Sequence, residues 1–387
     1  MCFAEWLRIS SDVSCETLIA HPFVDVAFGG MQAGSPIFDA CVNLVCELLY
    51  TAQDAGNLVF HNDALGWRCP DADAAAERSV RFAALAQVVI PRVMDLQPFY
   101  AAVLAGGVGS ENEACGFSRV FVELAETQMD LLASGTAEAL QIAELILACT
   151  RHPNAEISKL TFNVWYNLKT RLTVADTAEA KAQFRPIFVQ LVDVLIVLLR
   201  YSDTNDLMRR KAFRKTVQDV VCDACEVIGA SAVLERLWAS LQQEHPKLTQ
   251  DPSQWHGVEA ALYGVRCMVK YVAMGSRRSE GDVLPQILQL IPTLSVHDPA
   301  ARGSLSYSAI LVLRAGSLHY TATLVIGACA DWLNGMPELL PAVFPYLVNC
   351  LSLRGVKEAA ALSVKNGATS KPIAAIVACA HKLMMCI

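Results

Sequence analysis

The feature that most constrains the fold is a recurring pair of apolar segments with helical periodicity. The first members of five such pairs begin near residues 113, 154, 206, 253 and 317, at intervals of about 41, 52, 47 and 64 residues. Paired antiparallel helices that repeat at roughly 40–50 residues are typical of HEAT repeats. No alternating strand pattern of useful length competes with this interpretation. The sequence therefore predicts an all-α HEAT/armadillo-type superhelix, which is an α-α solenoid.

The expected elements follow from apolar spacing and from turn residues. The predicted helix pairs are Glu113–Leu132 with Ala137–Cys149, Asn154–Leu172 with Ala178–Arg200, Asp206–Ile228 with Ala230–Gln243, Ser253–Ala273 with Asp282–Leu290, and Ser317–Leu333 with Pro337–Leu351. Before them we expect Cys15–Phe28, Pro36–Gln53, a loop over Asp54–Asp73, and Ala74–Ala105 with kinks or breaks at Pro91 and Pro98. The second helices of the first three pairs are expected to line the cavity of the superhelix.

The stretch Arg151–Leu172 shows the pattern most clearly. Pro153 is tolerated at a helix edge, and Asn154 can cap the first free amides. The residues behind them that recur at spacings of three and four are Ile157, Leu160, Thr161, Val164, Trp165, Leu168 and Leu172. Phe162 and Tyr166 extend the apolar stripe to a second face. A helix with two apolar faces is expected to lie between neighbouring helices.

Two stretches interrupt the repeat. If Gly303–Ala315 is an insert of about 13 residues, the long last interval falls to about 51 residues. Lys365–Pro372 breaks an otherwise helical end. We therefore predict a HEAT-repeat array over residues 1–362 and an irregular helical end over residues 363–387. Met1–Ser10 reads as a helix already under way, and Ile387 ends inside an apolar helix, so an internal fragment of a longer array is expected.

Composition excludes several classes of protein. The chain has 387 residues, 54% of them hydrophobic and 18% charged, with a net charge of −7. The acidic balance argues against a general nucleic-acid binder and fits a surface that receives basic partners. The apolar runs Gly303–Ala330 and Val189–Leu199 contain charges or are too short, so buried helices are favoured over membrane spans. The 14 cysteines are dispersed, which favours reduced, buried thiols.

No constellation of residues predicts catalysis, a cofactor or a metal. Cys222 and Cys225 form a CxxC without a second ligand pair, which favours two core cysteines one turn apart over a metal or redox site. The eight histidines are single and far apart, so turn and cap roles are expected of them. Glu123 and Glu126 are interpreted as part of a solvated face. The sequence therefore predicts a binding protein and not an enzyme.

One local charge cluster is the candidate site for protein binding. Its five cations within seven positions are Arg209, Arg210, Lys211, Arg214 and Lys215. Such a cluster suits docking of an acidic loop or a phosphorylated segment. The alternative interpretation is an exposed first turn of a helix whose other face, with Phe213, Val217, Val220 and Val221, is buried. Four tryptophans at helical positions are interpreted as packing between repeats: Trp165, Trp238, Trp255 and Trp332.

The residues also resemble a known family. Phe117–Leu131 (FSRVFVELAETQMDL) and Arg151–Leu168 (RHPNAEISKLTFNVWYNL) are similar to two helices of the transportin-SR group in the importin-β superfamily. Phe213 and Arg214 with the valines that follow, Trp255–Val272 and His319–Leu351 resemble three further helices of that group, in the same order. The similarity extends from Met1 to about Leu362.

The resemblance implies a karyopherin that carries protein cargo through nuclear pores under Ran-GTP control. Cargoes of that group include Arg/Ser-rich splicing factors, and its partners include Ran and nucleoporins with Phe-Gly repeats. A monomer that shuttles between cytoplasm and nucleus is expected, with no direct nucleic-acid partner and no membrane insertion. The similarity does not include the family's main Ran contact or its C-terminal cargo surface, so no Ran or cargo residue is transferred. The alternative is a static HEAT-repeat scaffold for assembling a protein complex.

Overall fold

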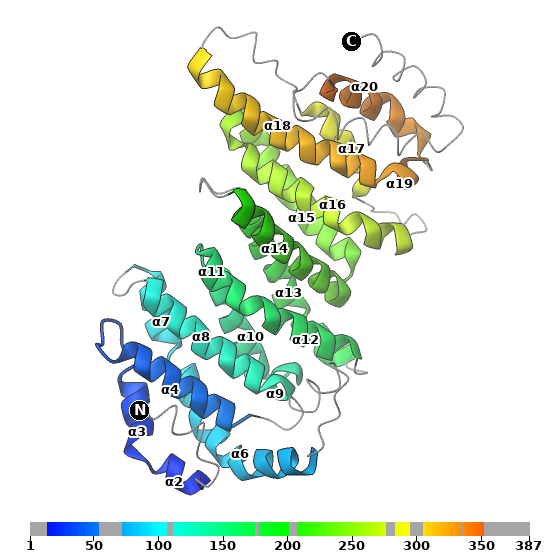
Figure 1. Ribbon diagram of the computed structural model, residues 1–387. Coiled ribbons are helices and arrows are strands. Elements are labelled where there is room, and N and C mark those ends of the chain that lie inside the picture. Colours follow the sequence, from blue (N-terminus) through cyan, green and yellow to red (C-terminus); the bar gives the residue numbers. More distant parts are fainter. Residues whose placement is uncertain are drawn as a thin grey trace. The chain divides into compact units, whose positions relative to one another are not determined.

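A computed structural model of the chain describes residues 14–53, 72–106, 111–174, 178–200, 207–275, 283–294, 305–334 and 336–351. Every regular element within these ranges is helical (Figure 1), which confirms the predicted all-α HEAT-type fold. The chain divides into two compact units, Met1–Leu191 and Val192–Ile387, and the boundary falls inside one helix. Each unit is described separately below.

Unit 1 contains the helices from α2 to the first part of α13. Their bounds are α2 (Cys15–Ile19), α3 (Pro22–Gly29), α4 (Phe38–Thr51), α6 (Ala72–Met94), α7 (Gln97–Leu104), α8 (Glu111–Thr127), α9 (Met129–Ala133), α10 (Ala137–Thr150), α11 (Ala155–Ser158), a 3-10 turn (Lys159–Thr161), α12 (Phe162–Val174) and α13 (Ala178–Leu198). Helix α4 packs against α8, and α8 also contacts α7, α10 and α12. The predicted boundaries agree with these helices to within a few residues, except where a predicted helix is divided.

Helix α8 carries the largest part of the unit 1 core. The rings of Phe117 and Phe121 are fully buried, and both lie against the ring of Tyr100 on α7. Phe117 also meets Phe38 of α4, with ring centroids 5.2 Å apart. At Gly116 a side chain would collide with Phe38 and Val42, so the missing Cβ lets α4 and α8 approach closely. The α4–α8 contact is therefore built on aromatic rings and one glycine.

The stretch around Trp165 begins where the sequence predicted. Asn154 Oδ1 accepts the Glu156 amide at 2.9 Å, as an N-cap does, but the predicted single helix is divided into α11, the 3-10 turn and α12. Trp165 is fully buried, and its Nε1 donates to Thr150 Oγ1 at 3.0 Å. Phe162 is buried as expected, whereas Tyr166 is 51% exposed, so the prediction of a second apolar face through Tyr166 is wrong. Lys169 Nζ lies 4.8 Å from the centre of the Tyr166 ring, which gives this ring a partner at the surface.

The two predicted proline breaks have different outcomes. Helix α6 continues through Pro91 to Met94, so Pro91 does not end it. Pro98 lies in the first turn of α7, where a missing amide is tolerated. The predicted loop over Asp54–Asp73 falls almost entirely outside the described residues.

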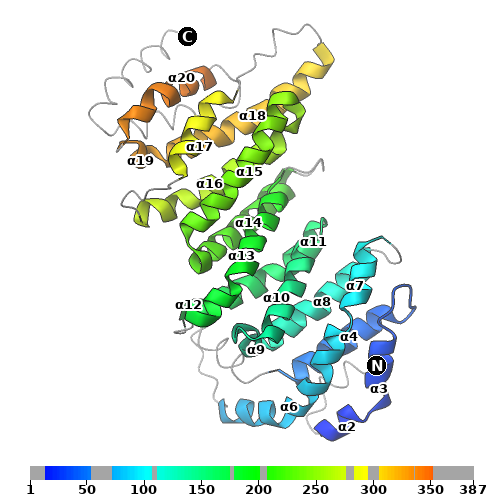
Figure 2. The same ribbon diagram turned by 180° about the vertical axis from the view of Figure 1, so that it is seen from behind.

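Unit 2 repeats the helix pairs with longer helices. Their bounds are α14 (Leu207–Ile228), α15 (Ala230–Gln250), a 3-10 turn (Pro252–Gln254), α16 (Trp255–Gly275), α17 (Leu284–Leu290), a 3-10 turn (Ile291–Thr293), α18 (Leu305–Ala328), α19 (Ala330–Asn334), a 3-10 turn (Pro337–Leu339) and α20 (Leu340–Cys350). Both views show α14, α16 and α18 stacked in that order (Figures 1 and 2). Gly229, with a φ of 88°, makes the single-residue turn between α14 and α15.

Helix α16 is the centre of unit 2, because it contacts α14, α15 and α18. Its Gly257 and Gly264 lie two turns apart and face α15. A Cβ at Gly264 would collide with Leu237, and a Cβ at Gly257 would overlap the carboxylate of Glu244. The two glycines therefore let α15 lie unusually close to α16.

The possible insert at Gly303–Ala315 stays a prediction. Leu305–Ala315 is helical and runs directly into the rest of α18. Lys365–Pro372 and the predicted end over residues 363–387 lie outside the described residues. Over the described part of the chain, no helix is both long and apolar enough to cross a membrane.

Candidate partner-binding site

The predicted cation cluster lies on the first half of α14. Lys211 and Lys215 are exposed, and their spacing of four residues places them on one face of the helix. Arg209 and Arg210 belong to the first turn of α14, but their side chains lie outside the described residues. Val217, Val220 and Val221 are buried, and Phe213 is half-buried, as expected for the opposite face. Among the cations whose side chains are described, Lys211 and Lys215 are therefore the exposed ones.

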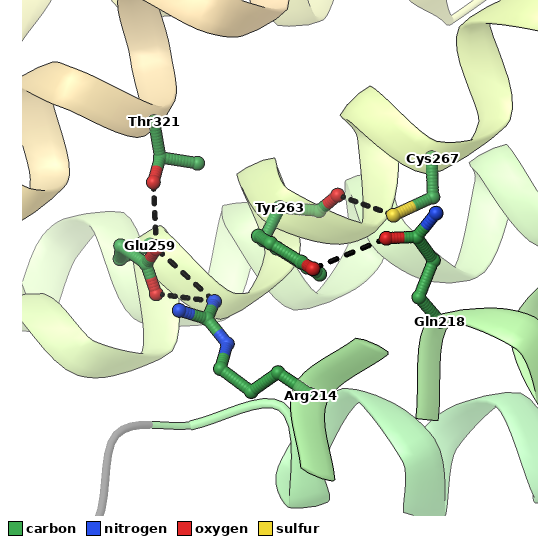
Figure 3. A network of polar contacts seen from close by, with 6 residues as sticks. All are labelled: Arg214, Gln218, Glu259, Tyr263, Cys267 and Thr321. Atoms are coloured by element: carbon green, nitrogen blue, oxygen red, sulfur yellow. Dashed lines mark hydrogen bonds and ion pairs between the residues drawn. The ribbon is translucent and has the colours of Figure 1, made fainter. Parts of the chain in front are cut away.

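Arg214 does not belong to this exposed face, and its assignment to the surface cluster is corrected. Successive residues on a helix are rotated by about 100°, so Arg214 points away from the face of Lys215 and toward α16. Its side chain is 8% exposed, and its Nη2 donates to both carboxylate oxygens of Glu259, at 2.8 and 3.1 Å (Figure 3). The Arg214 guanidinium also lies over the ring of Tyr263, 4.1 Å from its centre. This arginine holds the fold together and is not available to a partner.

The ion pair joins three helices. Glu259 of α16 is completely buried, and it also accepts a hydrogen bond from Thr321 Oγ1 of α18 at 2.7 Å. Nearby, Tyr263 donates to Gln218 Oε1 of α14 at 3.1 Å (Figure 3). Burial raises the pKa of Glu259, while Arg214 and Thr321 act in the opposite direction. We call Arg214, Glu259 and Thr321 the buried triad.

Ion pairs of a different kind join α13 and the two residues after it to α15. Arg236 binds both oxygens of Asp193, at 2.7 Å from Nε and 2.6 Å from Nη2, and the two side chains are 42% and 40% exposed. Arg200, 39% exposed, binds Glu244 at 3.0 Å, and Lys247 binds the same oxygen at 2.9 Å. These pairs were not predicted. The two residues of each pair, Asp193–Arg236 and Arg200–Glu244, lie 43 and 44 residues apart in the sequence. This separation equals one repeat period, and a search for opposite charges at that spacing would have identified both pairs.

The other residues considered for chemistry have structural roles. Cys222 and Cys225 are buried, as predicted, and burial raises the pKa of the Cys225 thiol to about 11, which makes it a poor nucleophile and ligand. His21 Nδ1 accepts the Phe23 amide, and His152 Nδ1 accepts the Asn154 amide, which confirms cap and turn roles for both. Among the residues whose positions are described, no group of three or more His, Cys, Asp or Glu is arranged to hold a metal.

The predictions for the tryptophans and for the acidic pair have different outcomes. Trp165 and Trp255 are buried and Trp238 and Trp332 half-buried, in agreement with packing roles. Glu123 and Glu126 are half-buried, so their interpretation as a solvated face is wrong. Asn163 of α12 donates to Glu126 at 2.6 Å, and burial, followed by the charges of Glu126 and Glu47, raises the pKa of Glu123 to about 7. Glu126 therefore helps to join α8 to α12, whereas Glu123 and Glu47 of α4 repel one another.

Comparisons with known proteins agree with this architecture. A family model described as the second TPR domain of transportin-3/importin-13 matches residues 110–197. The solved structure "Importin13 cytosolic state" matches 98% of this chain and 45% of its own chain, with a TM-score of 0.63 and 17% identity. This second match shows the same fold.

Similar sequences carry related names. Transportin MOS14 of Arabidopsis thaliana is 25% identical over 370 residues, which cover 90% of this chain and 34% of the relative. Importin-13 of Gallus gallus is 25% identical, with 90% and 33% covered, and the mRNA transport regulator MTR10 of Saccharomyces cerevisiae is 22% identical, with 87% and 31% covered. The chain spans about a third of the length of these relatives. In sequence and in fold the chain is therefore similar to proteins named transportin and importin.

Proposed function

We propose that this chain acts as a nuclear transport receptor of the importin-β type, which carries protein cargo through the nuclear pore under the control of Ran-GTP. The observation that carries the proposal is the match to relatives named transportin and importin over nine tenths of the chain. Arg/Ser-rich splicing factors are the cargo class that the family resemblance suggests. The proposed partners also include nucleoporins with Phe-Gly repeats, and the receptor is proposed to shuttle as a monomer between cytoplasm and nucleus.

The chemistry of the described residues supports binding over catalysis. The buried polar groups on which the helix contacts depend, such as Glu259 and Thr150, are already engaged with other side chains. We propose that the chain is not an enzyme and that it neither binds nucleic acid directly nor inserts into membranes. Its function would lie in its surfaces, and the second helices α10, α13 and α15 are the proposed cargo face. Because each repeat touches only its neighbours, Ran binding at one repeat can change the affinity for cargo at another.

The exposed cations of α14 are a proposed docking point for an acidic or phosphorylated segment. Lys211 and Lys215 supply two exposed positive charges one helical turn apart, and Arg209 and Arg210 precede them in the sequence of the first turn. The positive end of the helix dipole lies at the same place and favours an anion. Arg214 is excluded from this proposal because Glu259 binds it inside the fold.

The test is capture of proteins on the immobilised full chain, with Ran loaded with a non-hydrolysable GTP analogue or with GDP. We expect Ran-GTP to bind and to release captured proteins, and Ran-GDP to do neither. Captured proteins that stay bound in the presence of Ran-GTP would favour a static scaffold. A fluorescent chain added to permeabilised cells should collect at the nuclear envelope and enter nuclei.

The α14 surface is tested with the double variant Lys211→Glu/Lys215→Glu. A matched control is Arg266→Glu/Lys270→Glu, which reverses two exposed cations at the same spacing on α16. Binding of a phosphorylated or acidic partner should fall with the first variant only. Equal loss in both variants would show that general charge, and not this surface, attracts the partner.

A further inference from the structure

Two kinds of ion pair join the helices of unit 2: a buried one on one side and solvent-exposed ones on the other. On the side of α14, α16 and α18 lies the buried triad, with Glu259 fully buried and Arg214 8% exposed. On the side of α13 and α15, Asp193 and Arg236 are about 40% exposed, and Arg200 is 39% exposed. We propose that the buried triad is the hinge line of unit 2, and that the α13–α15 side opens and closes around it.

The argument rests on what happens to each charge when the helices separate. Asp193, Arg236 and Arg200 are already in contact with water, so they are rehydrated on separation at little cost. Exposed pairs of this kind contribute little to stability and are weakened by salt. Glu259 has no such access, and separating it from Arg214 would leave an uncompensated charge in the core. Bending that keeps the triad intact is therefore much easier than bending that breaks it.

Glu244 makes the opening reversible. Its carboxylate is bound by two cations: Arg200, two residues after the end of α13, and Lys247, on the same helix α15. When Arg200 leaves, Lys247 remains 2.9 Å from the same oxygen, so the 9% exposed carboxylate keeps a partner. The Glu244 carboxylate is therefore still paired with a cation after Arg200 has moved away.

The glycines of α16 determine which helix moves. Because Gly257 and Gly264 let α15 lie directly against α16, α15 is expected to stay with α16. The moving part is then the end of α13 in unit 2, residues 192–198, together with Arg200. An acidic segment that competes for Arg236 and Arg200 would hold this side open. The proposal does not depend on transport activity.

Hydrogen exchange of the full chain, measured at about 50 mM and about 500 mM salt, tests the hinge. Higher salt should speed exchange about threefold or more in residues 192–198 and in the facing turns of α15, and leave α14, α16 and α18 unchanged. Asp193→Asn should reproduce the high-salt pattern at low salt. Its matched control is Asp25→Asn, which removes the exposed Arg92–Asp25 pair of unit 1 and should leave exchange in unit 2 unchanged.

The hinge line itself is tested with Thr321→Val, which removes one hydrogen bond to Glu259 and keeps the ion pair. Exchange should rise in α16 and α18 at both salt concentrations alike, because the triad is shielded from solvent. Glu259→Gln should extend this rise to α14, by about tenfold or more if the protein remains folded. Salt that loosens α14, α16 and α18 as much as α13 and α15, or an Asp193→Asn variant with unchanged exchange, would overturn the proposal.

Discussion

In unit 1 the helices α4, α7 and α8 meet through aromatic rings, whereas in unit 2 α14, α16 and α18 meet around an ion pair. Phe117, Phe121 and Tyr100 fill the first contact with apolar surface, and the polar atoms there are neutral, with Ser118 Oγ donating to Tyr100 OH at 3.3 Å. In the second contact, the fully buried Glu259 depends on Arg214. Apolar packing loses stability in proportion to the atoms removed, while a buried charge depends on its partner. The same fold therefore responds differently to substitution in its two units.

The largest effect is expected for Glu259→Met, which leaves the Arg214 guanidinium buried without its carboxylate. We expect a loss of about 3–5 kcal/mol in the free energy of unfolding of unit 2. Phe117→Ala should cost unit 1 a similar ~3–5 kcal/mol through a cavity. Urea unfolding, combined with hydrogen exchange to assign each transition to a unit, measures both losses.

A second substitution then separates the two mechanisms. Arg214→Met added to Glu259→Met removes the orphaned charge and should restore most of the lost stability. No single polar change near Phe117 should restore the Phe117→Ala variant, because its deficit is missing volume. A double variant no more stable than Glu259→Met alone would show that the triad is not a mutually dependent pair, and the comparison would fail.

Much of the helical architecture could be predicted from the sequence. Apolar periodicity placed most helices, and Asn154 and Pro98 occupy helix starts as their chemistry requires. Helix propensity predicted a kink or break at Pro91, but the residue lies inside α6, because tertiary packing outweighs the local cost of a proline. The long last repeat interval coincides with a long helix, because α18 already begins at Leu305.

The site was harder to predict than the fold. A run of cations shows that charge is concentrated, but not which charge finds a partner inside the protein. Arg214 and Lys215 are adjacent in sequence and have opposite fates, because Glu259 lies 45 residues further on, one repeat later. Gln218 and Tyr263 are also 45 residues apart. Pairing complementary residues at the repeat period would have revealed these contacts, whereas local patterns cannot.

Glycines provide a smaller difference between the units. Gly116→Ala in α8 would push a methyl group against Phe38 and Val42, which are confined by the core. We expect a net loss of about 1–2 kcal/mol, because the overpacking exceeds the gain in helix propensity. Gly257→Ala meets the Glu244 side chain from its carboxylate to Cγ. This side chain has more rotatable bonds than the Phe38 ring and can shift further, so the net loss should be smaller than for Gly116→Ala, by about 1 kcal/mol. Equal losses in urea unfolding would contradict this distinction.

The smallest expected effect concerns Glu123, a half-buried carboxyl of α8 in unit 1. Burial and the charges of Glu126 and Glu47 raise its pKa from 4.5 to about 7, against the weaker effect of Arg119. A carboxyl with a raised pKa favours folding when protonated, so its contribution is fully present below pH 4.5 and is lost as the pH rises through about 7. Glu123→Gln removes the charge and should stabilise unit 1 above pH 7.

The gain should stay below about 2 kcal/mol, because Glu123 is only half-buried and solvent screens its charge. Unfolding midpoints at pH 4.5, 6 and 8 should show no difference between wild type and Glu123→Gln at the lowest pH and a growing advantage for the variant above it. The buried triad should not follow this trend, since Glu259 has Arg214 at 2.8 Å and Glu123 has no cation held in this way among the contacts of the described residues. A constant difference at all three values would mean that the Glu123→Gln substitution acts through packing, and the distinction between a proton-dependent cost in unit 1 and a compensated charge in unit 2 would not hold.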